Sequence, residues 1–212
     1  MEIVNGQIEN YAQSMSEPES DLLKKLNRET NAMILQPRMI SGHLQGRFLS
    51  LISKLIQPNL IVEIGTYTGY SALCLAEGLT ENGKIITIDI NEELENFTRS
   101  FFNQSVYQNQ IDYRIADAQF EIPKIENPID LVFIDADKKN NDLYVELLMD
   151  KIRPGGILMI DNVLWSGKIV DVQAMDKSTK ALKEFNEKFS KDSRVEKLLL
   201  PLRDGILILR KK

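Results

Sequence analysis

The feature that most constrains the fold is the stretch from residue 60 to residue 77, where an apolar run leads into a turn with two glycines and then into a helix-forming segment. Residues 60–64 are rich in β-branched side chains and predict a buried parallel strand. Gly65 and Gly69 allow a ligand to approach the backbone, and the following helix offers free N–H groups at its first turn. Strand, glycine turn and helix in this order are typical of the nucleotide-binding end of a doubly wound α/β sheet.

The turn differs from the dinucleotide fingerprint, because Gly-x-Gly-x-x-Gly is absent and only Gly65 and Gly69 are present. It therefore indicates an adenosine-type ligand without the pyrophosphate. Glu63 lies inside the apolar run, where a carboxylate is costly unless it has a partner such as a sulfonium or amino-group cation. An NAD-dependent oxidoreductase is disfavoured but stays an alternative, as does a non-enzymatic ligand-binding protein that uses the fold alone.

Apolar runs and helical stretches alternate along the chain, which predicts an α/β fold. The apolar runs lie at residues 60–64, 84–90, 111–115, 129–134 and 157–160. The helical stretches lie at residues 70–79, 91–104 and 140–152. Turns are predicted at Asn82-Gly83 and Pro154-Gly155-Gly156, just before strands. Two further β-rich runs, 194–200 and 205–210, are joined by a link too short for a parallel crossover, so we expect an antiparallel hairpin at one edge.

The N-terminal quarter, residues 1–57, is predicted to form helices that pack on a core domain of residues 58–212 and not a separate domain. Ser16-Glu17-Pro18-Glu19 fits a capping box before a helix at residues 21–33. Ser41 is predicted to cap a second helix with one continuous apolar stripe. The stripe comprises Leu44, Phe48, Leu51, Ile52 and Leu55. These helices would either lie over the ligand cleft or form a dimer contact.

Composition narrows the class of protein. The chain has 212 residues, enough for a full hydrophobic core, and a net charge of −5, which disfavours broad electrostatic binding to nucleic acid or to an anionic membrane. One cysteine excludes an intramolecular disulfide and a cysteine-based zinc site. We recognise no signal peptide and no apolar run of membrane-spanning length, so a cytoplasmic protein is expected.

Acidic residues occur at the predicted carboxyl ends of the strands, where ligands bind in such sheets. They are Glu63, Asp89, Asp117, Asp135 and Asp161-Asn162. Any single one could be a turn or capping residue, but together they predict a ligand site. Asp89 ends the second strand, where a ribose diol is held, and Asp117-Ala118 is placed to reach an adenine edge.

The carboxyl ends of the fourth and fifth predicted strands carry a different combination of polar side chains from the first three. Asp135, Asp161 and Asn162 present two carboxylates and an amide carbonyl on strands that we expect to be neighbours. Three such oxygens suit Mg²⁺, Mn²⁺ or Ca²⁺. Lys138 follows Asp135 by three residues and is either a general base close to the metal or a solvated lysine in a polar run.

Four other residues have less specific roles. His43, the only histidine, is expected at the surface or in packing because it has no visible catalytic partner. Cys74 is expected in the core. Trp165 is either a pocket wall or a packing residue. Tyr144 lies one or two helical turns beyond Lys138 and could face the same cleft.

Three motifs then define a resemblance: Val62–Ser71, Phe133–Lys138 and Asp161–Gly167. Together they closely resemble the cation-dependent O-methyltransferases of the caffeoyl-CoA and catechol type, over residues 36–210. The resemblance implies a Rossmann-like class I methyltransferase fold, with S-adenosylmethionine as the methyl donor and usually a homodimer. Residues Gly42–Gln45 replace a more polar stretch of the plant enzymes, so the acceptor pocket is expected to differ.

The same resemblance assigns roles to individual residues. Lys138 would be the catalytic base, acting with Asp135. The metal ligands would be Asp135, Asp161 and Asn162. The donor-binding residues would be Met39, Ser41, Glu63, Gly65, Tyr67, Ser71, Asp89, Ala118, Asp135 and Tyr144.

The expected activity is a metal-dependent transfer of a methyl group from S-adenosylmethionine to a hydroxyl of a vicinal dihydroxy aromatic (catechol-like, phenolic) small molecule. Mg²⁺ is the expected cation, with Mn²⁺ or Ca²⁺ as alternatives. Methylation of a hydroxyuridine in tRNA is the alternative substrate class, although the acidic balance of the chain counts against it. A basic patch for tRNA would have to come from Arg38, Arg47, Lys138, Lys139 and Lys168.

Overall fold

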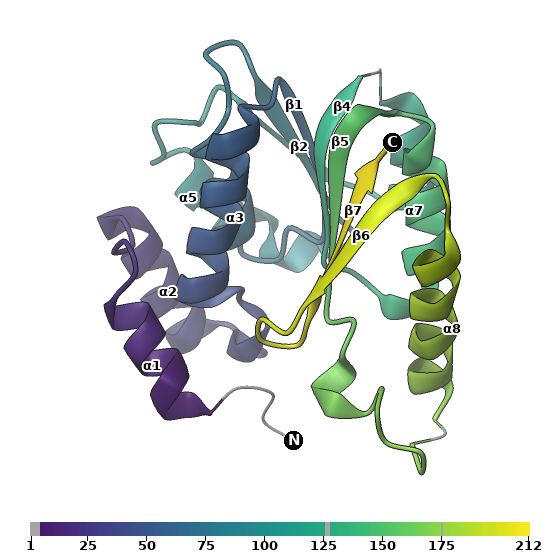
Figure 1. Ribbon diagram of the computed structural model, residues 1–212. Helices are drawn as coiled ribbons and strands as arrows, with labels where there is room; N and C mark the ends of the chain where they lie inside the picture. The colour runs from purple at the N-terminus through teal and green to yellow at the C-terminus, as the bar shows by residue number, and fades with distance from the viewer. Residues whose placement is uncertain (1–4, 126–127, 175) are drawn as a thin grey trace.

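A computed structural model gives the structure of the chain and describes residues 5–125, 128–174 and 176–212. Within these residues, seven strands form one sheet, and helices cover both of its faces (Figure 1). The strands are β1 Leu60–Ile64, β2 Lys84–Asp89, β3 Ile111–Ile115, β4 Ile129–Ile134, β5 Ile152–Asp161, β6 Val195–Leu200 and β7 Ile206–Lys211. The α-helices are α1 Gly6–Ser14, α2 Asp21–Met33, α3 Gly42–Ile56, α4 Tyr70–Ala76, α5 Glu95–Phe102, α6 Ala118–Glu121, α7 Asn141–Met149 and α8 Lys177–Lys191. Five short 3₁₀ helices are η1 Pro37–Met39, η2 Glu92–Leu94, η3 Ile122–Lys124, η4 Lys138–Asn140 and η5 Trp165–Gly167.

The sheet is mainly parallel, and its strand order is β3-β2-β1-β4-β5-β7-β6. Strands β1 to β5 pair in parallel, whereas β7 runs antiparallel to both β5 and β6. The chain reverses its direction of winding between β1 and β4, which is where doubly wound sheets open a ligand crevice. The predicted Rossmann-like fold with a C-terminal antiparallel hairpin is therefore confirmed.

The core lies in two layers, one on each face of the sheet, because the parallel strands are buried on both sides. On one face, Val132 and Ile160 pack against Val145 of α7 and Phe189 of α8. On the other face, side chains of α2, α3, α4 and α5 pack against the sheet around the fully buried Phe133. Figure 1 shows α3 and α5 on one side of the sheet and α7 and α8 on the other.

Strand β5 is longer than the sequence predicts. The sequence places a strand at 157–160 and a turn at Pro154-Gly155-Gly156, but β5 begins at Ile152 and includes the turn residues. The pairing of β4 with β5 changes register between Ile129 and Leu131, so the proline and glycines are accommodated as an irregularity within the strand. Proline and glycine thus mark a bulge here and not the start of the strand.

The start of α2 also corrects a prediction. The capping residue is Ser20, whose hydroxyl accepts a hydrogen bond from the Leu23 N–H at 3.3 Å, and not Ser16. The Ser16 hydroxyl instead donates to the Ala12 carbonyl, at the end of α1. Ser41 does precede α3 as predicted, although its side chain makes no capping hydrogen bond.

The predicted apolar stripe of α3 does not form the buried face of the helix. The buried residues are Gln45, Gly46, Leu49, Ser50 and Ser53, whereas Leu51 is 57% exposed and Leu55 is 73% exposed. The reason is close packing against α4, since a Cβ on Gly46 would lie only 2.6 Å from Cε1 of Tyr70. The buried face of α3 therefore consists of Leu49 and small or polar side chains, whereas Leu51 and Leu55 point outward and Phe48 and Ile52 are partly buried.

Helices α1, α6 and α8 are not predicted from the apolar pattern. Helix α8 is rich in lysine, but Leu182 and Phe189 on one side are fully buried. Asp176 caps its first turn by accepting a hydrogen bond from the Thr179 N–H at 3.0 Å. Helix α1 has no buried residue and is made mainly of polar side chains. No helix among the described residues is long and apolar enough to cross a membrane.

Candidate active site

A large cavity of about 1850 Å³ opens at the carboxyl ends of β1, β2, β4 and β5. It includes the switch point between β1 and β4, as expected for a doubly wound sheet. Its wall contains almost all of the site residues predicted from the sequence. These are Met39, Ser41, Gly65, Tyr67, Ser71, Asp89, Ala118, Asp135, Lys138, Tyr144, Asp161 and Asn162.

The turn after β1 brings the backbone close to the neighbouring strand end. Gly65 has a φ of +99°, and a Cβ at this position would lie 2.0 Å from the carbonyl oxygen of Asp135. Only glycine fits here, because the conformation and the contact both exclude a side chain. The Gly65 N–H donates to the Ile88 carbonyl at 2.9 Å, which fixes the turn between β2 and β4.

Glu63 is fully buried beneath the cavity and does not line it. One carboxylate oxygen, Oε2, accepts a hydrogen bond from the Thr87 hydroxyl at 2.5 Å, and Thr87 is in contact with the Thr66 hydroxyl at 2.6 Å. The other oxygen, Oε1, has no hydrogen bond of normal geometry within the described residues. Burial raises the pKa of Glu63 to about 8, although the Ser71 and Thr87 hydroxyls oppose the shift. The raised pKa favours the neutral acid, and a cation bound close to this carboxyl would favour its ionised form.

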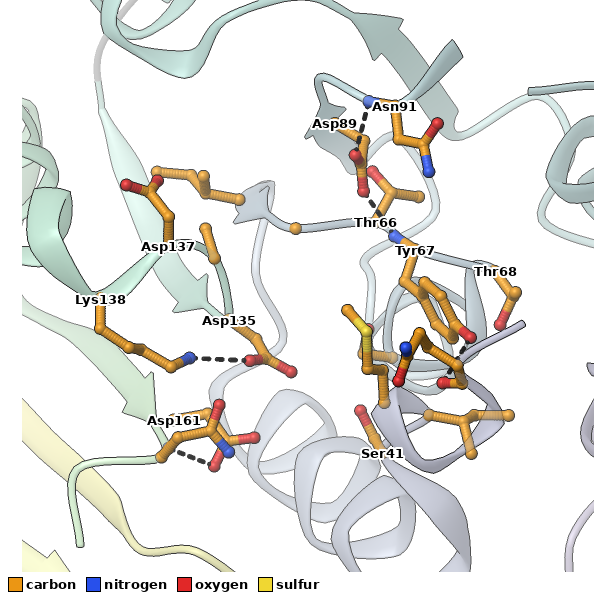
Figure 2. Close-up of a pocket in the computed structure, with 18 of the residues that line it drawn as sticks. Ser41, Thr66, Tyr67, Thr68, Asp89, Asn91, Asp135, Asp137, Lys138 and Asp161 are labelled. Atoms are coloured by element: carbon orange, nitrogen blue, oxygen red, sulfur yellow. Dashed lines mark hydrogen bonds and ion pairs between the residues drawn. The ribbon is translucent and has the colours of Figure 1, made fainter. Parts of the chain in front are cut away.

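Asp89 ends β2 and faces the cavity beside the glycine turn (Figure 2). Its Oδ2 accepts the Tyr67 N–H at 2.7 Å and its Oδ1 accepts the Asn91 N–H at 2.9 Å. The carboxylate is thus held in one orientation and keeps acceptor capacity for the two hydroxyls of a ribose. Asp117 caps α6 by accepting the Gln119 N–H at 2.9 Å, which places Ala118 in the cavity wall.

Asp135, Lys138 and Asp161 face one another on the other side of the cavity (Figure 2). The Lys138 ammonium lies 3.3 Å from Asp135 Oδ1, and its side chain is only 13% exposed. The alternative of a solvated lysine is therefore wrong. Asp161 is 3% exposed, and burial together with the nearby charge of Asp135 raises its pKa.

The side chains on this side of the cavity offer oxygen atoms to a divalent cation. The described residues contain no group of three His, Cys, Asp or Glu side chains suited to a metal ion. The ligand set predicted from the sequence includes an asparagine. It consists of the carboxylates of Asp135 and Asp161 and the amide of Asn162, which all line the cavity wall. Burial and, after it, the nearby charge of Asp135 raise the pKa of Asp161, and a cation between the two carboxylates would offset both effects. The donor set fits a hard cation that keeps part of its water shell.

The remaining predicted residues divide into those at the cavity and those away from it. Tyr144 lines the cavity and donates its hydroxyl to Asp137 Oδ1 at 2.8 Å, and Trp165 forms part of the wall. His43 lies outside this cavity, with Nε2 at 2.7 Å from the Glu17 carbonyl oxygen. Cys74 is fully buried in the core, as predicted.

The structure also adds residues that the sequence did not indicate. Gln45, fully buried, donates from Nε2 to Asp161 Oδ2 at 2.7 Å. Arg203 and Asp204, at the tip of the β6–β7 hairpin, line the same cavity. Gln45 and Arg203 are 116 and 42 residues from Asp161 in sequence, so no local pattern could associate them with it.

Comparison with known proteins places the chain in a family. The family model described as O-methyltransferase matches residues 13–212. A probable caffeoyl-CoA O-methyltransferase 2 of Dictyostelium discoideum is 33% identical over 98% of this chain and 92% of that protein. A caffeoyl-CoA O-methyltransferase of Medicago sativa is 33% identical over 91% of this chain and 83% of that protein.

Solved structures agree with the sequence comparison. An SAH-bound methyltransferase from Podospora anserina superposes with a TM-score of 0.89 at 26% identity, covering 98% of this chain and 94% of that one. An O-methyltransferase from Bacillus cereus in complex with SAH gives a TM-score of 0.88 at 27% identity, with 97% of both chains covered. The resemblance stated from the three motifs is therefore confirmed, and this chain is an enzyme that belongs to the O-methyltransferase family.

Proposed function

We propose that this enzyme transfers a methyl group from S-adenosylmethionine to one hydroxyl of a small vicinal dihydroxy aromatic molecule, and that a divalent cation assists the transfer. The observation that carries the proposal is the placement of Asp135, Lys138 and Asp161 together in one cavity with Asp89. The first three residues suit a metal and a proton acceptor, and Asp89 suits the ribose of a nucleoside donor.

The donor would lie along the glycine turn. Asp89 would accept hydrogen bonds from the ribose hydroxyls, and Ala118 would lie beside the adenine. Glu63 would ionise below the donor's amino group, because the burial that raises its pKa is offset when a cation binds nearby. The SAH in the two similar solved structures supports this assignment, since SAH is what S-adenosylmethionine becomes after losing its methyl group. Met39, Ser41, Tyr67, Ser71 and Tyr144 would complete the donor site.

The metal would be held by Asp135, Asp161 and Asn162, with Mg²⁺ as the expected ion and Mn²⁺ or Ca²⁺ as alternatives. Such an ion, when bound, lowers the pKa of an acceptor hydroxyl and orients the two oxygens of a catechol. The chain's own contribution is to hold the reacting groups in line and to exclude water.

Lys138 would take the proton from the hydroxyl that attacks the methyl group. Its ammonium pairs with Asp135 at 3.3 Å, so the proposed base lies next to one of the residues that would hold the metal. A general base acts as the neutral amine, and repulsion from a cation held by Asp135 and Asp161 would favour that form.

The test is transfer of labelled methyl from S-adenosylmethionine to a 3,4-dihydroxyphenyl acceptor, with Mg²⁺ and with a chelator. We expect transfer that the chelator abolishes, and loss of transfer in Asp135→Ala without loss of fold. Asp112→Ala removes a carboxylate that pairs with Arg114 on β3, outside the cavity wall, and serves as the matched control. Full activity of Asp135→Ala in the presence of chelator would refute the metal assignment.

The tRNA alternative gains no support from the charges around the cavity. Three of the five basic residues that it needs are paired: Arg47 with Glu77, Lys138 with Asp135, and Lys168 with Asp176. Since the partner carboxylates cancel these charges, the residues do not form a free basic patch for phosphates. Salt-sensitive binding of tRNA would revive the alternative.

Three further proposals concern the organisation of the chain. We propose that residues 1–57 fold together with residues 58–212 as one unit. We also propose a homodimer, which the exposed Leu51 and Leu55 of α3 support, and a cytoplasmic location. Light scattering on the purified chain tests the dimer directly.

A further inference from the structure

A single buried glutamine lies between two charged residues at the edge of the cavity. Gln45 is on the second turn of α3 and is 0% exposed. Its Nε2 is 2.7 Å from Asp161 Oδ2, and its Oε1 is 3.3 Å from an Nη1 nitrogen of Arg203. The proposed mechanism uses Asp161 but neither of the other two residues.

The chemistry of the two neighbours fixes the orientation of the Gln45 amide. A guanidinium only donates hydrogen bonds, so Arg203 requires the amide oxygen of Gln45 on its own side. The amide N–H must therefore point to Asp161, and the amide oxygen must point to Arg203. A flipped amide would place its N–H groups against the N–H groups of Arg203, so the glutamine presents its donor to Asp161.

Arg203 is itself held firmly in place. The same Nη1 donates to the carbonyl oxygen of Ile40 at 2.8 Å and to that of Ser41, just before α3 begins. Arg203 lies in the link between β6 and β7, and its φ of +48° is unusual for a residue with a side chain. Figure 1 shows this hairpin tip reaching the lower end of α3.

The next residue of the hairpin, Asp204, contacts the loop that follows Asp161. The Asp204 carbonyl accepts the Leu164 N–H at 2.8 Å, and its side chain accepts the Ser166 N–H. The hairpin tip therefore joins the start of α3 to the end of β5. Asp161 sits between these two attachments.

Both oxygens of the Asp161 carboxylate accept hydrogen bonds from uncharged donors. Asp161 Oδ1 accepts the Asn162 N–H at 2.7 Å, and Oδ2 accepts the Gln45 amide. A cationic side chain in direct contact would compete with a metal for the same oxygens. The Gln45 amide lies between Arg203 and Asp161 and separates their side chains. The orientation of the Asp161 carboxylate is therefore fixed without an ion pair to Arg203.

We propose that Gln45, oriented by Arg203, is a positioning residue that holds Asp161 in the geometry needed to bind the divalent cation. The inference rests on the proposed function, because it assumes the metal site of Asp135, Asp161 and Asn162. Residues behind metal ligands usually change metal affinity about 10- to 100-fold when they are replaced.

The experiment measures Mn²⁺ affinity by titration, with free Mn²⁺ detected by electron paramagnetic resonance, in wild type and in Gln45→Met. Methionine has a similar length but no donor for Asp161. We expect Mn²⁺ to bind at least about tenfold more weakly, while the Kd for SAH, measured by calorimetry, stays within about twofold. A purely structural role would change both constants together.

The matched control is Ser53→Ala on the same helix. It removes another fully buried hydrogen bond, from the Ser53 hydroxyl to the Leu75 carbonyl at 2.6 Å, without touching Asp161. Its Mn²⁺ affinity should equal that of the wild type. A loss in Ser53→Ala as large as in Gln45→Met would overturn the inference, because general loosening of α3 would then be the cause.

A second variant covers the case in which Gln45→Met does not fold. Arg203→Met leaves the amide in place but frees its orientation, and we expect Mn²⁺ to bind more weakly, by about threefold or more. Where both fold, the double variant should bind no more weakly than Gln45→Met alone, since Arg203 acts through the same amide.

Unchanged Mn²⁺ affinity in the variants that fold would overturn the inference and leave the metal site standing. Absence of Mn²⁺ binding in wild type would overturn the metal site itself, and the inference with it.

Discussion

The buried Glu63 makes a prediction about stability that depends strongly on pH. Its pKa is raised from the ordinary value of 4.5 to about 8, mainly by burial. Since the folded-state pKa exceeds the unfolded one, the neutral acid favours the fold fully below pH 4.5, and this contribution is lost as the pH rises through 8. Glu63→Gln replaces the acid with an amide that does not titrate.

The size of the effect follows from the shift. Each unit of pKa is worth about 1.4 kcal/mol, so wild type loses roughly 5 kcal/mol from this residue between acidic pH and pH above 8. Most of this loss of stability occurs between the two pKa values, 4.5 in the unfolded chain and about 8 in the folded one. Between about pH 5.5 and 7.5, the free energy of unfolding of Glu63→Gln should rise relative to wild type by about 2 to 3 kcal/mol.

Urea denaturation of both proteins at a series of pH values measures this difference. Glu77→Gln is the matched control, because salt bridges to Arg47 and Lys54 lower the pKa of Glu77 below its ordinary value of 4.5. Its difference from wild type should therefore stay constant over the same range, since Glu77 titrates at lower pH. A Glu63→Gln difference that also stays constant would show that Glu63 is ionised in the free enzyme, and would refute the reasoning.

Two further predictions concern catalysis and packing. Lys138→Met should lower kcat by about 100-fold or more, the usual contribution of a general base, with the donor Kd unchanged; the exposed neighbour Lys139→Met is the control, and an equal loss there would contradict the role of Lys138. Gly65→Ala should lower the free energy of unfolding by about 3 kcal/mol or more, because its Cβ would lie 2.0 Å from the Asp135 carbonyl oxygen. Gly155→Ala shares the positive φ but meets only the Arg153 and Arg210 side chains, at 3.4 Å or more, so thermal melts should show a smaller loss.

Some of the site could be predicted because it follows from local sequence. The carboxyl ends of neighbouring parallel strands meet at one edge of the sheet, so Asp89, Asp135 and Asp161 had to lie near one cavity once the strands were identified. The β-branched runs identified β1 to β4 to within one residue. Gly65 and Gly69 likewise indicate a turn with positive φ angles, a backbone conformation that few other residues adopt.

Other features depended on contacts that no local pattern contains. Periodicity predicted an apolar stripe on α3, but the close approach of α4 at Gly46 selected another face for burial, made of Leu49 and small or polar residues. Capping residues compete with one another, and the choice of Ser20 over Ser16 depended on where α1 ended. The proline and glycines of β5 were absorbed into the strand by its pairing with β4.

The sequence by itself determined strands β1 to β4, helices α4, α5 and α7, the glycine turn and the acidic strand ends, because each depends on residues close together in the chain. Only the tertiary structure decided which side chains surround those acids. It buried Glu63 next to Thr87, placed Gln45 against Asp161, and brought Arg203 to Gln45. Burial and the neighbours brought by folding set the charge state and orientation of a carboxylate, and most of these neighbours are distant in the chain.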